Sequence, residues 1–395
     1  MKMHKTRYYS WKTGSMAKGC KLCVAGCKTV VFITGLCSKH CFYCPISEKK
    51  YGKDVIYINE WPTRKIGDLI KEIELCSSKG VGITGGDPLV KIDRTIDFIK
   101  RLKKRFGTKF HVHLYTPLNL VNEKNLERLY GSGLDEIRFH PDIVDNKLWG
   151  RIMLAGKYKW DVGVEIPAMP GKEKETKKLI DFLEGKVDFL NINELEYSDT
   201  NASYLKGHGF KTKDKLSYGI KGSEELAFRL LKYCSGKIKN VHYCTAKLKD
   251  KVQLAKRIKR RAGNIAKPFD IVSKDGILMR GAIYLKELRP SFSYHSILKK
   301  INTKKRNKII KRLNKIKDQL KKDFKIKKNL IEIDKIKLRI LTSVEIVNRI
   351  KDEINISFLE NVDMDGGFLG DKGLFLAVVE EYPTYDQFEL SVDFL

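Results

Sequence analysis

Three closely spaced cysteines form the most informative motif in this sequence. Cys37, Cys41 and Cys44 follow a CxxxCxxC spacing, so one short loop can bring three thiolates to a common centre. Soft thiolate sulfur suits iron–sulfur chemistry, and three such ligands can hold three irons of a [4Fe–4S] cube. The fourth iron would lack a local protein ligand and stay open to a substrate or cofactor. The competing hypothesis is zinc, but structural zinc sites are closed by four ligands in paired motifs, which this run does not match.

A second set of cysteine and histidine residues lies outside this loop. Cys20 and Cys23 form a CxxC pair, and His242 and Cys244 stand one residue apart much further along the chain. Together they supply four ligands, which is enough for one tetrahedral zinc ion. Further cysteines in both regions would also allow an auxiliary iron–sulfur cluster. The plain alternative is that no metal binds here, so the sequence leaves a second site open, with zinc ahead of a cluster.

The segments around the cysteine loop alternate between strand-like and helix-like patterns. Six short apolar runs have the composition of buried strands: 30–34, 81–84, 110–115, 136–139, 162–166 and 189–193. Between them, stretches such as 66–77 and 94–106 space their apolar residues as amphipathic helices do. This alternation predicts an α/β fold with a parallel sheet covered by helices. Because a closed barrel usually has eight strands, we expect an open, partial barrel of six strand–helix units.

Two motifs on these elements resemble the radical S-adenosylmethionine (SAM) superfamily. The run from Cys37 to Cys44 is similar to its cluster motif, including an aromatic residue, Tyr43, before the last cysteine. Residues 84–88, Thr-Gly-Gly-Asp-Pro, are similar to its Gly-Gly-Glu element, with aspartate in place of glutamate. The resemblance implies one [4Fe–4S] cluster on the three cysteines, which would make them the catalytic ligands. It also implies that SAM is held through its amino group by Gly85, Gly86, Asp87 and Pro88.

The resemblance implies an activity as well as a fold. In the superfamily the reduced cluster passes one electron to SAM, which breaks into methionine and a 5′-deoxyadenosyl radical. That radical takes a hydrogen atom from the substrate. Segments 18–23, 34–37 and 380–384 resemble, more narrowly, an archaeal group related to pyruvate formate-lyase activating enzymes. The superfamily resemblance covers roughly residues 30–200, and neither resemblance identifies the substrate.

Several polar residues are expected to face the cleft of the predicted barrel. Arg138, His140 and Glu165 lie near the carboxyl ends of predicted strands, as do His113 and Asn193. Functional residues collect at these ends in sheets of this kind. We therefore expect some of them to contact SAM or the substrate. For any one of them, a structural hydrogen bond is an equally good interpretation.

The chain outside the barrel divides by composition. Residues 1–29 form a basic, cysteine-containing extension, 30–200 the partial barrel, and 201–267 a capping region that ends in a basic helix. We expect a separate small α+β domain over residues 268–395. Within it, residues 269–285 predict a hairpin turned at Asp275-Gly276, and residues 296–329 predict one long lysine-rich helix.

The charge balance bears on the partners. The chain has 78 Lys and Arg against 48 Asp and Glu, a formal net charge of +30. A lysine-rich thermophile protein would show this, and so would a protein that binds a polyanion such as RNA. No run approaches the roughly 18 apolar residues of a membrane span. The basic N-terminus has no apolar segment behind it, so we expect a cytoplasmic protein without membrane contact.

These observations lead to three functional hypotheses. The first is a radical SAM enzyme that modifies a macromolecule, with RNA, and tRNA in particular, ahead of protein. The second is an activase of a glycyl-radical enzyme or another protein-modifying radical SAM enzyme. The third, from a different class, is a non-catalytic metal-containing RNA-binding module. Either enzyme would need an electron donor such as ferredoxin or flavodoxin.

Overall fold

The computed structural model describes residues 2–215, 217–360 and 374–395. The chain divides into two compact units, Met1–Arg257 and Ile258–Leu395. The expected boundary between residues 267 and 268 lies ten residues beyond this division. The finer four-part division expected from composition stays a prediction.

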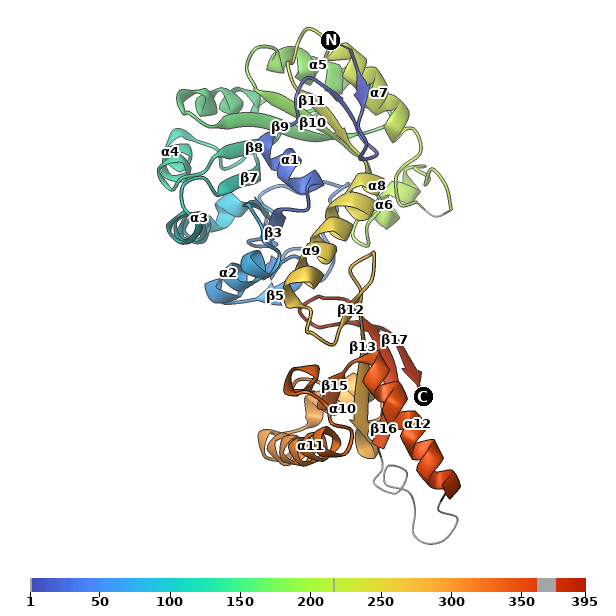
Figure 1. Ribbon diagram of the computed structural model, residues 1–395. Helices are drawn as coiled ribbons and strands as arrows, with labels where there is room; N and C mark the ends of the chain where they lie inside the picture. The colour runs from blue at the N-terminus through green and yellow to red at the C-terminus, as the bar shows by residue number, and fades with distance from the viewer. Residues whose placement is uncertain (1, 216, 361–373) are drawn as a thin grey trace. The chain divides into compact units, whose positions relative to one another are not determined.

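The first unit is built on one large sheet whose central strands are all parallel (Figure 1). Neighbouring strands follow the order β3-β6-β7-β8-β9-β10-β11. Their bounds are β3 Lys28–Phe32, β6 Gly80–Thr84, β7 His111–Pro117, β8 Glu136–His140, β9 Asp161–Ala168, β10 Phe189–Glu194 and β11 Val241–Cys244. All six predicted strands are present, and the partial α/β barrel is confirmed. Strand β11 extends it by a seventh parallel strand, which the sequence missed because a four-residue run shows too little periodicity.

Short antiparallel strands flank the parallel ones. Strands β4 (Ile56–Ile58) and β5 (Trp61–Thr63) continue the sheet beyond β3. At the other edge, β2 (Trp11–Thr13) pairs with β11, and β1 (His4–Lys5) pairs with β2. The N-terminal extension therefore contributes two short strands to the sheet. Strands of two and three residues are too short to leave a pattern in the sequence.

Amphipathic helices cover the outside of the parallel strands (Figure 1). Their bounds are α2 Ile66–Leu75, α3 Ile92–Phe106, α4 Glu123–Gly131, α5 Glu173–Leu183 and α7 Ser223–Tyr233. Helix α3 is typical: Ile96, Ile99 and Leu102 are buried against the sheet, while lysines occupy the opposite side. The burial of these apolar stripes is the main favourable contribution to the stability of the unit.

Helix α1 (Lys18–Val24) packs against β3, β6 and β7, near the ends where these strands begin. The backbone N–H of Gly19 donates to the Glu136 carboxylate on β8 at 3.0 Å. A Cβ atom at Gly19 would lie 2.6 Å from both His113 and Arg138, so only glycine fits this approach. The N-terminal CxxC motif therefore lies on a helix that contacts the polar side chains of the barrel interior.

The second unit is a small α+β domain with an antiparallel sheet in the order β14-β15-β13-β16-β17. The strands are β12 Ile271–Val272, β13 Leu278–Leu285, β14 Ile331–Asp334, β15 Arg339–Thr342, β16 Leu374–Glu381 and β17 Glu389–Phe394. Strand β12 pairs antiparallel with β13, and Gly276 between them has φ +84°, so the predicted hairpin is confirmed.

The single long helix predicted over residues 296–329 is wrong. Two helices occupy this region, α10 (Tyr294–Lys300) and α11 (Thr303–Asp323). The break falls at Asn302, whose extended backbone and side-chain acceptor for the Lys305 N–H, at 2.9 Å, cap the start of α11. A 17-residue helix, α12 (Val344–Glu360), follows β15.

Candidate radical SAM site

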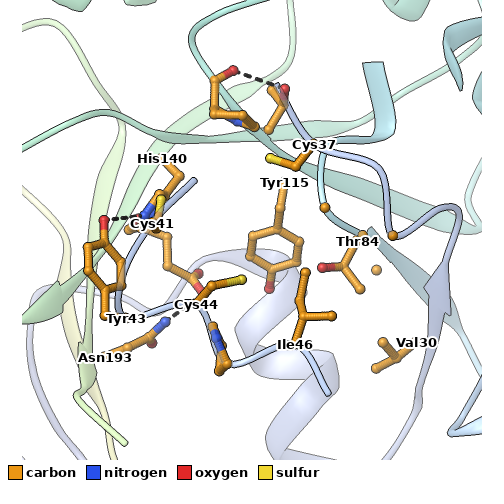
Figure 2. Close-up of a pocket in the computed structure, with 18 of the residues that line it drawn as sticks. Val30, Cys37, Cys41, Tyr43, Cys44, Ile46, Thr84, Tyr115, His140 and Asn193 are labelled. Atoms are coloured by element: carbon orange, nitrogen blue, oxygen red, sulfur yellow. Dashed lines mark hydrogen bonds between the residues drawn. The ribbon is translucent and has the colours of Figure 1, made fainter. Parts of the chain in front are cut away.

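A cavity of about 570 Å³ opens at the carboxyl ends of the first unit's parallel strands. Its wall includes the three loop cysteines, both glycines of the Gly-Gly-Asp-Pro element, and side chains from β3, β6, β7, β8, β9 and β10. In Figure 2, Cys37, Cys41 and Cys44 lie around one side of this space, and Val30 and Thr84 lie on the other. This is the edge at which parallel α/β sheets place their functional residues.

The cysteine loop follows β3 directly. Its end is fixed by a turn in which the Cys44 N–H donates to the Cys41 carbonyl at 3.0 Å. The Lys39 N–H lies 3.4 Å from Cys37 Sγ, an orientation that favours a thiolate. Burial raises the pKa of all three thiols, so they are neutral at physiological pH until a metal displaces their protons. Three free thiols at the wall of one cavity fit a cluster with one open iron.

The Gly-Gly-Asp-Pro element packs tightly against the start of the cysteine loop. The Gly86 N–H donates to the Thr34 carbonyl at 2.8 Å, and the Asp87 N–H donates to the Leu36 carbonyl at 2.9 Å. A Cβ at Gly85 would lie 2.6 Å from the Thr34 oxygen, and one at Gly86 only 2.4 Å from the Leu36 oxygen. The glycines are thus required for the approach of the two segments, and their bare backbone forms part of the cavity wall. A wall of this kind fits a closely bound ligand such as SAM.

Asp87 does not line this cavity. Its carboxylate is fully buried and accepts three hydrogen bonds, from the Leu89 N–H at 3.0 Å, the Thr116 hydroxyl at 2.8 Å and the Ser38 hydroxyl at 3.3 Å. Pro88 is also buried and begins a short 3-10 helix, Pro88–Lys91. The expected contact of these two residues with the SAM amino group stays a prediction. The Asp87 side chain joins the cysteine loop, β7 and the segment after β6.

Tyr43 and His140 are brought together at the rim of the cysteine loop. The Tyr43 hydroxyl lies 2.9 Å from His140 Nε2, and His140 Nδ1 lies 2.7 Å from the Glu165 carbonyl oxygen. Burial, with a smaller contribution from Lys39, lowers the pKa of His140, so the imidazole is neutral at physiological pH. Both side chains line the cavity, as expected of residues that touch a cofactor or substrate.

Glu165 and Arg138 belong to a buried polar network. Arg138 pairs with Glu165 at 2.9 Å and with Glu136 at 2.5 Å. Asn191 and Asn193 donate to the two oxygens of Glu165 at 2.8 and 2.9 Å. Burial alone would raise the pKa of Glu165, but Arg138 and the two amides outweigh it and lower that pKa. Glu165 reaches the cavity wall, whereas Arg138 lies beneath it and holds Glu165 in place.

The second cysteine and histidine set is gathered in one place. Cys20, Cys23, His242 and Cys244 all line a smaller pocket of about 100 Å³, and Cys23 also lines the main cavity. In the described ranges, no three His, Cys, Asp or Glu side chains converge as they would around a single bound ion. The side chains of Cys37, Cys41 and Cys44 do not converge in this way either. The second metal site is therefore not shown by this arrangement and stays a prediction.

The cavity residues that sequence reasoning did not single out include Lys28, Tyr115, Lys249 and Gln253. Tyr115 could have been found, because it follows His113 by two residues on a predicted strand and must share its face. Lys249 and Gln253 lie on a π-helical segment, Lys249–Leu254, between α8 (Ala246–Leu248) and α9 (Ala255–Ile265). The sequence predicts a basic helix there, but nothing in its pattern indicates the wider turn that places these side chains.

Comparison with known proteins agrees with this site. The sequence profile of the radical SAM superfamily matches residues 31–166, from β3 to β9. A Methanocaldococcus jannaschii protein, named as a candidate glycyl-radical enzyme activating enzyme, is 47% identical over 284 residues. The alignment covers 70% of this chain and 75% of that protein. The chain belongs to the radical SAM superfamily, and it is an enzyme that uses a [4Fe–4S] cluster and SAM.

Solved structures with a similar arrangement are more distant. The [FeFe]-hydrogenase maturase HydG has 11% identity and a TM-score of 0.40, with 60% of this chain and 62% of that one aligned. Methylornithine synthase has 14% identity and a TM-score of 0.37, with 52% and 62% aligned. Similarities at this level carry no argument about the substrate of this chain. Among the described residues, no helix is long and apolar enough to cross a membrane.

Proposed function

We propose that this chain activates a glycyl-radical enzyme by removing a hydrogen atom from a glycine α-carbon of that partner protein. The observation that carries this proposal is the 47% identity to the Methanocaldococcus jannaschii protein over 75% of its length. When bound, the cluster and SAM supply reductive cleavage to a 5′-deoxyadenosyl radical, which accepts the hydrogen atom. The chain itself must hold both groups, exclude water and orient the glycine.

The cavity walls have groups suited to these tasks. Cys37, Cys41 and Cys44 would hold the cluster, and the backbone at Gly85 and Gly86 would border SAM. The amides of Asn193 and Gln253 would be available to pair with peptide N–H and C=O groups of a substrate segment, as neutral side chains. A polypeptide segment needs such pairing because its polar groups lose water when it enters a cavity.

RNA is retained as a second candidate substrate because of one feature of the second unit. Helix α11 exposes Lys304, Lys305, Lys308, Lys311 and Lys315, a density of positive charge that suits phosphate contacts. The comparisons give RNA, including tRNA, no support. The non-catalytic RNA-binding hypothesis is set aside, since the family is one of enzymes.

The electron donor belongs to the same proposal. Any member of the family needs a one-electron reductant for its cluster, and ferredoxin or flavodoxin is the expected class. We also propose that the protein is cytoplasmic, because electron donors of this class occur in the cytoplasm.

The test uses anaerobically reconstituted protein, SAM and dithionite. We would measure 5′-deoxyadenosine, and the glycyl-radical signal by electron paramagnetic resonance, with a glycyl-radical enzyme from the same organism as partner. The expected result is partner-dependent 5′-deoxyadenosine and an organic radical, both absent from Cys41→Ala and from a partner whose radical glycine is replaced by alanine. A stimulation by bulk tRNA without any effect of the partner would contradict the proposal and favour RNA modification.

A further inference from the structure

The smaller pocket beneath the main cavity joins segments that are far apart in the sequence. Cys20 and Cys23 lie on α1, one helical turn apart and therefore on neighbouring positions of one face. His242 and Cys244 lie two residues apart on β11, so their side chains share one face of that strand. All four residues line the same pocket of about 100 Å³. A helix and a strand separated by more than 200 residues thus direct three thiols and one imidazole to a common space.

The contacts of Cys20 bring the helix and the strand together. Its Sγ lies 3.4 Å from Asn191 Nδ2 and 3.4 Å from the Arg138 guanidinium. Asn191 is the direct neighbour of His242 in the parallel register of β10 and β11. Through Asn191, the Cys20 sulfur is thus linked to the strand position directly beside His242, and both residues line the same pocket.

The two ring nitrogens of His242 have different surroundings. Its Nε2 lies 3.1 Å from the Ser10 hydroxyl, whereas its Nδ1 is buried and has no hydrogen-bond partner in the part of the chain that the structure describes. A buried polar atom without a partner costs free energy, and a neutral imidazole nitrogen is a common zinc ligand. The Ser10 contact on the other nitrogen would fix the ring, as partners of metal-bound histidines do.

The charges around the pocket also suit a metal. Three thiolates and one divalent ion leave a single net negative charge, which needs a cation nearby. Arg138 supplies one at 3.4 Å from Cys20 Sγ, and Lys249 lies beside Cys244. Hydrogen bonds from Arg138 and Asn191 to the sulfur stabilise a thiolate rather than a thiol.

From this geometry we propose that Cys20, Cys23, Cys244 and Nδ1 of His242 bind one zinc ion. A three-cysteine, one-histidine set is a standard structural zinc site and has no open position. The ion would tie α1 to β11 and form part of the floor of the main cavity, because Cys23 lines both spaces. The side chains do not yet converge as ligands do, and the loop cysteines of the cluster do not either. Zinc binding therefore requires these side chains to move from the positions that they occupy in this structure.

The proposal does not depend on the substrate, so its test avoids catalysis. The starting protein is the full chain with Cys37, Cys41 and Cys44 all replaced by alanine, which removes the iron of the radical SAM cluster. Purified from zinc-containing medium, it should hold about one zinc ion per chain by mass spectrometry of the metals. Exchange of zinc for cobalt should give the thiolate charge-transfer bands and intense d–d bands of a tetrahedral sulfur-rich site.

Matched variants on the same background decide the ligands. Cys20→Ser and Cys244→Ser should each lose most of the zinc and the cobalt bands, and His242→Ala should weaken the binding. Cys76→Ser and Cys234→Ser remove buried thiols that do not line the pocket, and they should keep the metal. Circular dichroism would verify that each variant is folded. Metal-free protein, zinc that persists in both Cys20→Ser and Cys244→Ser, or iron in place of zinc would each overturn the proposal.

Discussion

The Tyr43 hydroxyl lies 2.9 Å from Nε2 of His140, and this hydrogen bond joins the cysteine loop to strand β8. Its direction follows from the other ring nitrogen. Nδ1 of His140 lies 2.7 Å from the Glu165 carbonyl oxygen, which can only accept, so Nδ1 carries the proton. Nε2 is then an acceptor, and Tyr43 is the donor. Tyr43, the aromatic residue of the cluster motif, is thus held in place by a hydrogen bond to strand β8 of the barrel.

Replacement of Tyr43 by phenylalanine should therefore destabilise the protein. The partly buried Nε2 of His140 would lose its donor, at a cost of about 0.5–1.5 kcal/mol in the free energy of unfolding. Urea unfolding of the metal-free protein measures this loss. Tyr51→Phe is the control, because Tyr51 is exposed and its hydroxyl shares a hydrogen bond with the exposed His40. Equal stability of the two variants would contradict the assigned hydrogen bond.

Asp87 is expected to act by positioning its neighbours. Asp87→Asn retains an oxygen for the Leu89 N–H and the Thr116 hydroxyl, so it should keep most of the stability and most of the SAM affinity. Asp87→Ala removes the acceptor of two buried donors, the Leu89 N–H and the Thr116 hydroxyl, and should lower the free energy of unfolding by several kcal/mol. Isothermal titration with SAM and urea unfolding compare the two. A stable Asp87→Asn protein that no longer binds SAM would instead mean direct contact with the SAM ammonium group.

The packing of Gly86 leads to a prediction about cluster content. In Gly86→Ala the new methyl group would lie within 2.4 Å of the Leu36 carbonyl oxygen, so the start of the cysteine loop must move. We expect less iron and sulfide per chain after reconstitution, and a weaker absorption of the cluster. Gly150→Ala is the matched control, since no atom lies within 4 Å of a Cβ there. Full cluster occupancy in Gly86→Ala would show that the loop tolerates the shift.

The buried His113 predicts a pH dependence of stability. Burial, then the charges of Lys28 and Arg138, lower its pKa well below the ordinary value, while Glu136 opposes them. Below about pH 6.5, the unfolded chain therefore binds a proton at His113 that the folded protein does not bind. Stability from this group is complete above that pH and is lost as the pH decreases, by up to about 1.4 kcal/mol per pH unit.

His113→Gln tests this assignment. Glutamine keeps an acceptor for Lys28, whose Nζ lies 3.0 Å from His113 Nε2, but it does not titrate. The free energy of unfolding, measured between pH 7 and pH 5, should fall less steeply in the variant than in the unchanged protein. The same slope in both would assign the loss to other groups.

The sequence alone determined the class of this protein. The CxxxCxxC loop, the Gly-Gly-Asp-Pro element and six strand–helix units are local patterns, each read from spacing within a few residues. Local spacing is sufficient here because the cluster loop and the Gly-Gly-Asp-Pro element are each made of consecutive residues. Local periodicity predicted one long helix across Asn302, and this was wrong. The side chain of Asn302 caps the start of α11, although the row of apolar residues continues on both sides of it.

Only the tertiary structure decided which distant residues share a space. The motif predicts that Asp87 contacts SAM, but only the fold shows that its carboxylate also accepts hydrogen bonds from Ser38 and Thr116. Cys20 of α1 and His242 of β11 line the same pocket, and Cys20 contacts Asn191, the neighbour of His242, although no periodicity encodes this arrangement. Long-range contacts depend on how strands register and helices pack, and those are properties of the whole chain rather than of any segment.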